Sequence, residues 1–367
     1  MTEYKQVRKG KMDFWIFITI LILLAIGTIM VFSSSAAYAY SKFHDTYYFL
    51  KKQIQWLVLG IIAMIIMANI DYRKYAKYSP IALAITGVLM VLTLFTPKIN
   101  GARRWLWIFQ PSEILKITLI LFFAYMMSKY YKKMGTFVYG FIPYIALTGA
   151  FCGILYLQPH MSCALIIVLV TAVMMILAGA KIRYFLLAVG AVVPVVVFLV
   201  ATKMDYIRER VFAFLDPFAD QSDTGYQIVQ SLYAIGSGGL FGNGIGRSLQ
   251  KYLYLPEPYN DFILSILAEE LGFVGVVAVI FIFGLLIWRG FKVANNAPDR
   301  YGSLLAGGIT TLIAVQVVIN IAVVTSSMPV TGMPLPFFSY GGTSLVFLLI
   351  DMGILLNISR YATYEKF

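Results

Sequence analysis

Charge is scarce in this sequence. Of its 367 residues only 13% are Asp, Glu, Lys or Arg, whereas 60% are hydrophobic. Soluble chains carry about 25% charged and about 45 to 50% apolar residues. A soluble fold could not bury so much apolar surface, so the composition excludes soluble domains and indicates a protein that crosses a membrane several times.

Cysteine and histidine are also rare, with two residues of each. Cys152 and Cys163 lack Cys-x-x-Cys spacing, and we assign them no chemistry. The formal net charge is +12, but nucleic-acid binding would need a soluble basic surface, and the composition leaves none.

Long stretches without a charged residue predict the membrane spans, because a helix needs about 20 apolar residues to cross the hydrocarbon core. The uncharged runs 134–180 and 301–350 are each long enough for two passes, broken at 158–160 and at 329–342. We predict an all-α polytopic membrane protein of about ten transmembrane helices, at 14–34, 50–70, 78–96, 110–130, 137–157, 161–180, 184–202, 262–288, 303–326 and 342–360.

Lysine and arginine gather on the two termini and on alternate connections, such as 73–77, 129–133 and 289–300. Short loops rich in these residues stay in the cytoplasm. An even number of spans places both termini on one side, so we predict that both are cytoplasmic.

One connection is much longer than the others. We predict a single integral-membrane domain, 1–367, with an extracytoplasmic loop module at 203–260, between helices seven and eight. Within it, 225–235 has the pattern of a short amphipathic helix, and six glycines follow between 236 and 246. The P-loop pattern is absent and no strand precedes the glycines, so we interpret them as backbone packing against the membrane helices.

Acidic residues gather where this loop enters helix eight. Asn260 or Asp261 is placed to cap that helix. Glu257, Glu269 and Glu270 lie close by in the sequence, which is more acid than a cap needs. We therefore consider Asp261 a candidate site residue as well as a cap.

A basic and aromatic cluster precedes helix four. Arg103, Arg104 and Trp105 lead into it, and Glu113 and Lys116 are i, i+3 neighbours on its first turns. These residues fit an interfacial ion pair with an aromatic belt. They also fit a site for a diphosphate, because arginine presents a fork that matches phosphate oxygens.

The segment between helices nine and ten is rich in proline and glycine, and such irregular backbone at membrane depth is tolerated where it lines a cavity. Asp351, about one third into the last helix, is a costly intramembrane carboxylate and so a candidate site residue, without an evident partner.

These motifs, taken in order, resemble the SEDS family of shape, elongation, division and sporulation proteins (FtsW, RodA and SpoVE). The similarity covers nearly the whole chain, and Thr331 and Thr343 resemble the FtsW/SpoVE branch. The matching strings are Gln110-Pro111-Ser112-Glu113 with Lys116, Gly225-Tyr226-Gln227, Gly238 to Gly242, Lys251, Leu255-Pro256-Glu257, Asp261-Phe262-Ile263, Glu269-Glu270-Leu271-Gly272 and Pro329 to Leu345.

The resemblance implies a peptidoglycan glycosyltransferase in a bacterial cytoplasmic membrane. Such an enzyme polymerises lipid II on the outer face and pairs with a class B penicillin-binding protein. The family's essential aspartate falls on Asp261. The matched motifs also supply the candidate substrate-binding residues, which are Arg103, Arg104, Trp105, Glu113, Lys116, Gln227, Lys251, Glu257 and Ser339. Asp351 stands where the family normally has an uncharged residue, and His160 where it often has an aspartate.

The expected reaction inverts the donor sugar in one displacement, so it needs one base, and Asp261 is our candidate. Cationic side chains or a divalent cation would neutralise the departing diphosphate. No other cofactor is expected.

Two rival functions stay open, a lipid II flippase and a non-catalytic scaffold for a transpeptidase. The sequence also leaves open whether the process is division, sporulation or elongation.

Overall fold

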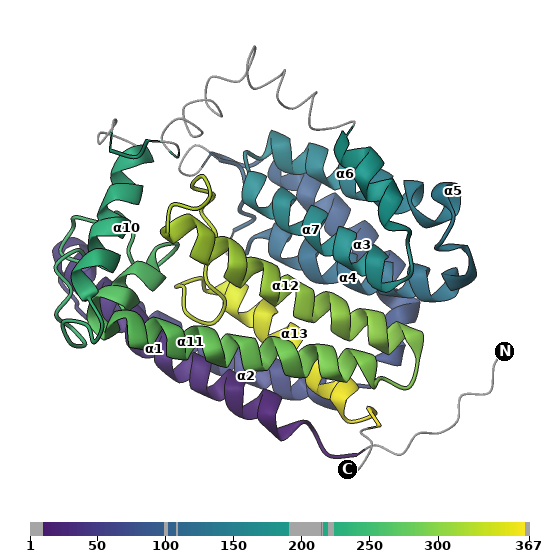
Figure 1. Ribbon diagram of the computed structural model, residues 1–367, viewed down its shortest axis with the longest axis horizontal. Helices are drawn as coiled ribbons and strands as arrows, with labels where there is room; N and C mark the ends of the chain where they lie inside the picture. Colours follow the sequence, from purple (N-terminus) through teal and green to yellow (C-terminus); the bar gives the residue numbers. More distant parts are fainter. Residues whose placement is uncertain are drawn as a thin grey trace.

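The computed structural model describes residues 10–98, 102–107, 109–190, 214, 216–218 and 224–363. Within these ranges the chain is helical and has no β-strand beyond one isolated bridge. The helices run side by side in one bundle (Figure 1).

The described residues form the following helical elements in chain order. They are α1 (Phe14–Phe43), α2 (Tyr48–Asn69), α3 (Arg73–Thr93), α4 (Pro111–Lys129), the 3-10 turn η1 (Tyr131–Lys133), α5 (Phe137–Gly140), α6 (Ile142–Leu157), α7 (Met161–Leu177), α10 (Thr224–Gly238), α11 (Ile263–Asn295), α12 (Arg300–Val324) and α13 (Thr343–Ser359).

Nine of the ten predicted spans have a counterpart within the described residues. Seven helical segments, α5 and α6 counted as one, are long and apolar enough to cross a membrane, and α7 and α13 are shorter apolar helices. The predicted span 184–202 is described only as far as residue 190, where the chain is helical, and the rest lies outside the described residues. The chain is therefore a multi-pass membrane protein.

Helix boundaries differ from the prediction where a helix continues past the apolar run. The helix α1 ends at Phe43 rather than 34, and α11 ends at Asn295 rather than 288. The helix α3 begins at Arg73, five residues early, because Arg and Lys are good helix formers even where they would not enter the hydrocarbon core.

The first and the last described segments of the chain meet. The backbone N–H of Gly10 donates to the carbonyl of Arg360 at 2.8 Å, so residues 10 and 360 lie at the same end of the bundle. The opposite end, which we call the site end, carries the turns after α1, α3 and α6 and the segments that lead into α4, α11 and α13.

The helix α12 forms the centre of the bundle. It packs against α3, α4, α7, α10, α11 and α13, and most of its side chains are buried. At Gly308 a Cβ would stand 2.7 Å from the side chain of Ile120 and 2.9 Å from that of Met174. Small residues allow such close approach where no hydrophobic effect drives helices together in lipid.

The helix α11 is broken near its start, at Gly272 (φ 69°, ψ −172°). The glycine-rich turn after α10 lies against this break. A Cβ on Gly238 would stand 2.0 Å from the carbonyl of Ala268, and one on Gly242 would stand 2.2 Å from that of Glu270. Across this contact the N–H of Asn243 donates to the carbonyl of Glu269 at 3.0 Å, and the N–H of Phe273 donates to the carbonyl of Gly239 at 2.9 Å. The interpretation of the glycines as backbone packing is confirmed for Gly238 and Gly242.

The proline- and glycine-rich segment between α12 and α13 enters the bundle as irregular backbone. Its side chains Leu335, Phe337 and Phe338 are buried. The Asn320 amide donates to the carbonyl of Met333 at 2.6 Å, and the Leu335 N–H donates to Ser339 Oγ at 2.7 Å. Side chains therefore satisfy backbone groups that no helix satisfies, as membrane depth requires.

Candidate active site

A cavity of about 810 Å³ opens at the site end. Five regions of the chain that are distant in sequence line it: the start of α2, the turn before α4, the turn before α7, the segment before α11 and the segment before α13. Its lining residues are Phe49, Lys52, Gln55, Trp56, Leu59, Arg104, Trp105, Gln110, Glu113, His160, Glu257, Tyr259, Asn260, Asp261, Gly332, Pro334, Tyr340, Gly341, Gly342, Thr343 and Ser344.

Asp261 lies at the cavity, and two contacts to the backbone of residues 260 and 261 hold it there. The Asn320 amide donates to the Asp261 carbonyl at 2.9 Å, and Ser339 Oγ donates to the carbonyl of Asn260 at 2.7 Å. The predicted capping role is wrong, because the N-cap of α11 is Phe262 and no side chain caps it. The amide of Asn260 instead donates to Glu257 at 2.9 Å. The carboxylate of Asp261 is thus left for the cavity.

The surroundings of Asp261 raise its pKa to about 6. Burial is the main cause, since it disfavours the charged form, and the negative charge of Glu257 adds to it. The positive charge of Arg104 acts in the opposite direction. A carboxylate with this pKa is mostly ionised near neutral pH and yet basic enough to accept a proton, as a general base requires.

The basic segment before α4 divides between two places. Arg104 and Trp105 line the cavity, and the Arg104 guanidinium donates to the carbonyl of Pro159. Arg103 does not line the cavity, and its guanidinium donates to the carbonyl of Leu94 at 2.6 Å, at the end of α3. Arg104 is therefore the arginine placed to meet a ligand.

Aromatic rings form another part of the cavity wall. Phe49 packs on Tyr259 with ring centroids 4.5 Å apart and on Tyr340 at 4.9 Å. Tyr340 also pairs with Tyr259 through the backbone, its N–H donating to the Tyr259 carbonyl at 2.9 Å. This cluster joins α2 to the segments that precede α11 and α13, and so fixes the wall next to Asp261.

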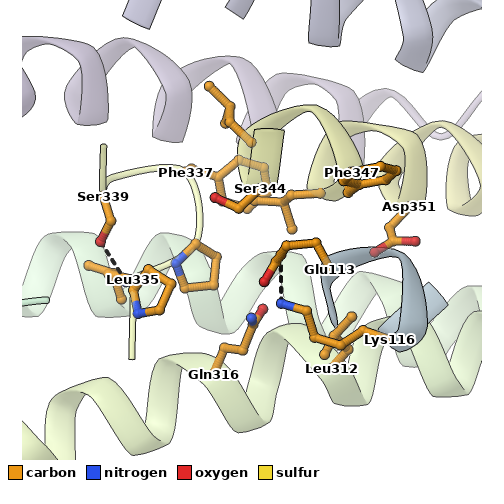
Figure 2. Close-up of a pocket in the computed structure, with 14 residues that line it drawn as sticks. Glu113, Lys116, Leu312, Gln316, Leu335, Phe337, Ser339, Ser344, Phe347 and Asp351 are labelled. Carbon is orange, nitrogen blue, oxygen red and sulfur yellow. Dashed lines mark hydrogen bonds and ion pairs between the residues drawn. The ribbon is translucent and has the colours of Figure 1, made fainter. Parts of the chain in front are cut away.

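Glu113 and Lys116 form an ion pair of 2.8 Å on the first turns of α4. The pair borders a second, enclosed pocket of about 30 Å³, shown in Figure 2, which Gln316, Ser339 and Asp351 also line. Glu113 lines the large cavity as well, whereas Lys116 lines only the enclosed pocket among those described. The predicted pairing is confirmed, and Ser339 lies beside the enclosed pocket rather than in the large cavity.

Two predicted substrate-binding residues lie elsewhere. Gln227, on α10, lines none of the pockets found among the described residues. Lys251 is 4% exposed, and its ammonium group donates to Glu270 at 2.9 Å and to Ser33 at 3.2 Å. Lys251 thus joins the loop to α1 and α11.

The extra acids near Asp261 are not part of the cavity either. Glu269 accepts from Ser248 Oγ at 2.5 Å and from the N–H of Leu249 at 2.7 Å. Both Glu269 and Glu270 are fully buried. Glu269 thus holds the backbone of the loop onto α11, whereas Glu270 pairs with Lys251 and accepts from Ser33 Oγ. Neither lines the large cavity.

Lys52, Trp56 and His160 are among the cavity residues that the sequence analysis did not identify as site residues. Lys52 and Trp56 lie on the first turns of α2, and the polar signal there is the charged and amide run that starts this helix. Burial, with the charges of Arg104 and Lys116, lowers the pKa of His160 to about 3. His160 is therefore a neutral hydrogen-bonding group at neutral pH.

The donor set for a metal is small. No group of three or more His, Cys, Asp or Glu side chains converges within the part of the chain that the structure describes. The acids next to each other at the cavity are Asp261 and Glu257. The cations that line it are Arg104 and Lys52.

Comparison with known proteins gives full-length matches. The family model described as cell cycle protein, FtsW/RodA/SpoVE, matches residues 14–364. Stage V sporulation protein E of Bacillus subtilis (strain 168) is 42% identical over 97% of this chain and 99% of its own length. A probable peptidoglycan glycosyltransferase FtsW of Geobacter sp. (strain M18) is 42% identical over 95% of this chain and 96% of its own.

Solved structures share the fold. A chain from a structure described as "Structural coordination of polymerization and crosslinking by a peptidoglycan synthase complex" aligns with a TM-score of 0.81 at 28% identity, covering 97% of this chain and 99% of its own. The rod shape determining protein RodA of Thermus thermophilus aligns with a TM-score of 0.71 at 27% identity, covering 96% of this chain and 98% of its own.

Proposed function

The chain belongs to the FtsW/RodA/SpoVE family and is a peptidoglycan glycosyltransferase of cell division or sporulation, and we propose that the cavity at Asp261 is its active site. One observation carries this assignment. A carboxylate with a pKa of about 6 faces an open cavity that also holds an arginine. General-base catalysis in the presence of an anionic leaving group requires both groups.

The reaction follows from the substrate class. In lipid II a disaccharide-peptide is linked through a diphosphate to a polyprenyl chain. The 4-hydroxyl of an acceptor GlcNAc attacks the anomeric carbon of the donor MurNAc. The bond to the diphosphate breaks as the glycosidic bond forms, and the configuration inverts. Asp261 takes the hydroxyl proton, and polyprenyl diphosphate leaves with the electron pair.

The cavity supplies the remaining groups. Arg104 and Lys52 face the leaving diphosphate and neutralise its developing charge. The rings of Trp105, Tyr259 and Tyr340 give flat apolar surfaces on which sugar rings can lie. Arg103, Gln227, Lys251 and Ser339 act through structure, since each is held outside the large cavity.

The cavity should open to the cell exterior, and the termini should be cytoplasmic. The end of the bundle opposite the site carries Arg73, Lys129, Lys132 and Lys133 on its turns. Short turns rich in these residues remain in the cytoplasm. The family's location in a bacterial cytoplasmic membrane and the loop module 203–260 belong to the same proposal.

We also propose a class B penicillin-binding protein as the partner. The structure to which this chain is similar is described as a synthase complex that coordinates polymerization and crosslinking. A glycan polymerase needs a crosslinking activity to act on its product, and a transpeptidase supplies it.

The test is polymerisation of lipid II by the purified full-length chain, with products separated on a gel. Asp261→Asn keeps the shape of the side chain but removes the base, and we expect a loss of about two to four orders of magnitude. Asp45→Asn is the matched control, because Asp45 is an aspartate at the same end of the bundle, paired with Lys51 at 2.8 Å and outside the cavity. Asp261→Asn with wild-type activity would refute the site, and a wild-type chain that only moves lipid II would favour the flippase.

A further inference from the structure

Asp351 is a buried carboxylate that the proposed reaction does not use. It lies on α13, is 4% exposed, and its Oδ1 has no hydrogen-bond partner. It lines the enclosed pocket together with the Glu113–Lys116 ion pair (Figure 2). The charged groups that act on it are Lys116 and Glu113.

The pocket brings two carboxyl groups, those of Glu113 and Asp351, to one ammonium group, that of Lys116. The other polar groups that line the pocket, from Gln316, Ser339 and Ser344, are neutral. A buried charge is stable only when it is paired. Lys116 pairs with Glu113 at 2.8 Å, and Asp351 lines the same pocket with its Oδ1 unpartnered.

Glu113 differs from the other two charged residues in its position. It borders both the enclosed pocket and the large cavity that holds Asp261, whereas Lys116 and Asp351 border only the enclosed pocket of the two. Glu113 is thus the member of the trio that can turn toward a ligand in the large cavity. Without another carboxylate nearby, that movement would leave Lys116 as an unpaired buried cation.

We propose that Asp351 is a second counter-ion for Lys116, which holds the ammonium group when the Glu113 carboxylate turns to a hydroxyl or N–H donor of the bound sugar-peptide. The identity of the ligand rests on the proposed function. The exchange of counter-ions rests on the geometry of the pocket. Asp351 is a positioning residue in this scheme, since it acts through Lys116.

Thermal unfolding of the full-length chain in detergent, without substrate, tests the exchange. Glu113→Gln and Asp351→Asn each leave Lys116 one carboxylate, but the double variant leaves none. We expect the midpoint of the double variant to fall at least about 3 °C further than the sum of the single shifts. In a Lys116→Met background, which leaves two acids and no cation, Asp351→Asn should raise the midpoint more than it does in the wild type.

Arg289→Met supplies the matched control. Arg289 pairs with the buried Asp13 next to the termini, at the end of the bundle opposite the site. Its loss should add to that of Asp351→Asn without coupling. The proposal would be overturned if the shifts were additive both for Glu113→Gln with Asp351→Asn and for Lys116→Met with Asp351→Asn. This result does not depend on whether the chain polymerises lipid II.

Kinetics test the release of Glu113. In Asp351→Asn, Lys116 has only Glu113 as a partner and holds it away from the ligand. We expect the KM for lipid II to rise roughly fivefold or more with kcat little changed. In a Glu113→Gln background Asp351→Asn should leave KM unchanged. A purely structural role of Asp351 would lower the active fraction and hence kcat, and that pattern would refute the release.

Discussion

The pH dependence of polymerisation should report the charges around Asp261. If Asp261 is the base, only its ionised form is active, so kcat/KM should be constant above the pKa and fall below it. With a pKa of about 6, the ionised fraction at pH 5 is about one tenth, and the rate should fall about tenfold for each further unit of acid.

Two substitutions should shift the acid limb of the pH profile, where kcat/KM falls, in opposite directions. Glu257 raises the pKa of Asp261 and Arg104 lowers it. Glu257→Gln should therefore shift the limb to lower pH, and Arg104→Gln should shift it to higher pH. We expect shifts of about 0.5 to 1 unit, equivalent to about 0.7 to 1.4 kcal/mol of interaction with the charged form.

The assay is the initial rate of lipid II polymerisation by the purified chain at subsaturating substrate, in buffers of constant ionic strength between about pH 4.5 and 8. Arg104→Gln should also lower the constant rate above the pKa, because we propose that Arg104 neutralises the leaving diphosphate. Glu257→Gln should lower this rate less. Thermal midpoints at each pH would separate loss of activity from unfolding. Shifts in the same direction, or an acid limb that both variants leave in place, would refute Asp261 as the group that titrates.

Three other predictions concern the scaffold. Gly272→Ala should lower the free energy of unfolding by about 3 kcal/mol, because φ is 69° there and a Cβ would stand 2.3 Å from the Gly242 nitrogen; Gly284→Ala, which meets nothing within 4 Å, is the control in thermal unfolding. Lys251→Met should cost about 3 to 5 kcal/mol by leaving Glu270 buried and unpaired, and Glu270→Gln in the same chain should restore part of this. A cysteine at Lys132 should resist an impermeant thiol reagent in intact cells and one at Ser41 should react, and the reverse would invert the topology.

The membrane spans could be predicted because a segment that crosses the hydrocarbon core gives one strong signal in the sequence, a long run without charged residues. That signal says little about helix ends. The residues Arg73 to Lys77 interrupt the apolar run and yet form the start of α3, because helix geometry does not change at the edge of the membrane. The break at Gly272 was also invisible, since it depends on the glycine turn that packs against it.

The candidate site was predictable only in part. Asp261, Arg104 and Glu113 were found because polar residues at the membrane boundary are conspicuous. Lys52 and Trp56 were missed because they lie at the start of α2, far in sequence from the motifs, and only packing of α2 beside α13 brings them to the cavity. Lys251 lies outside the large cavity in a buried ion pair with Glu270, and the sequence could not show this because an ion pair and a ligand site use the same residue types.

The buried acids discussed above therefore fall into two groups, according to whether their carboxylate oxygens accept hydrogen bonds from the protein. Glu269 and Glu270 accept hydrogen bonds from Ser248, Leu249, Ser33 and Lys251, so each is balanced by the loop it holds and gains nothing from a ligand. Asp261 has its carboxylate at an open cavity, and Asp351 has an oxygen without a partner. A buried carboxylate without a hydrogen-bond partner lowers the stability of the protein. We therefore expect such a group only where another group can bind to it. For Asp261 we propose the acceptor hydroxyl as that partner, and for Asp351 the ammonium of Lys116. Unpartnered carboxylate oxygens, rather than the mere presence of an acid, thus distinguish Asp261 and Asp351 from the acids that hold the loop.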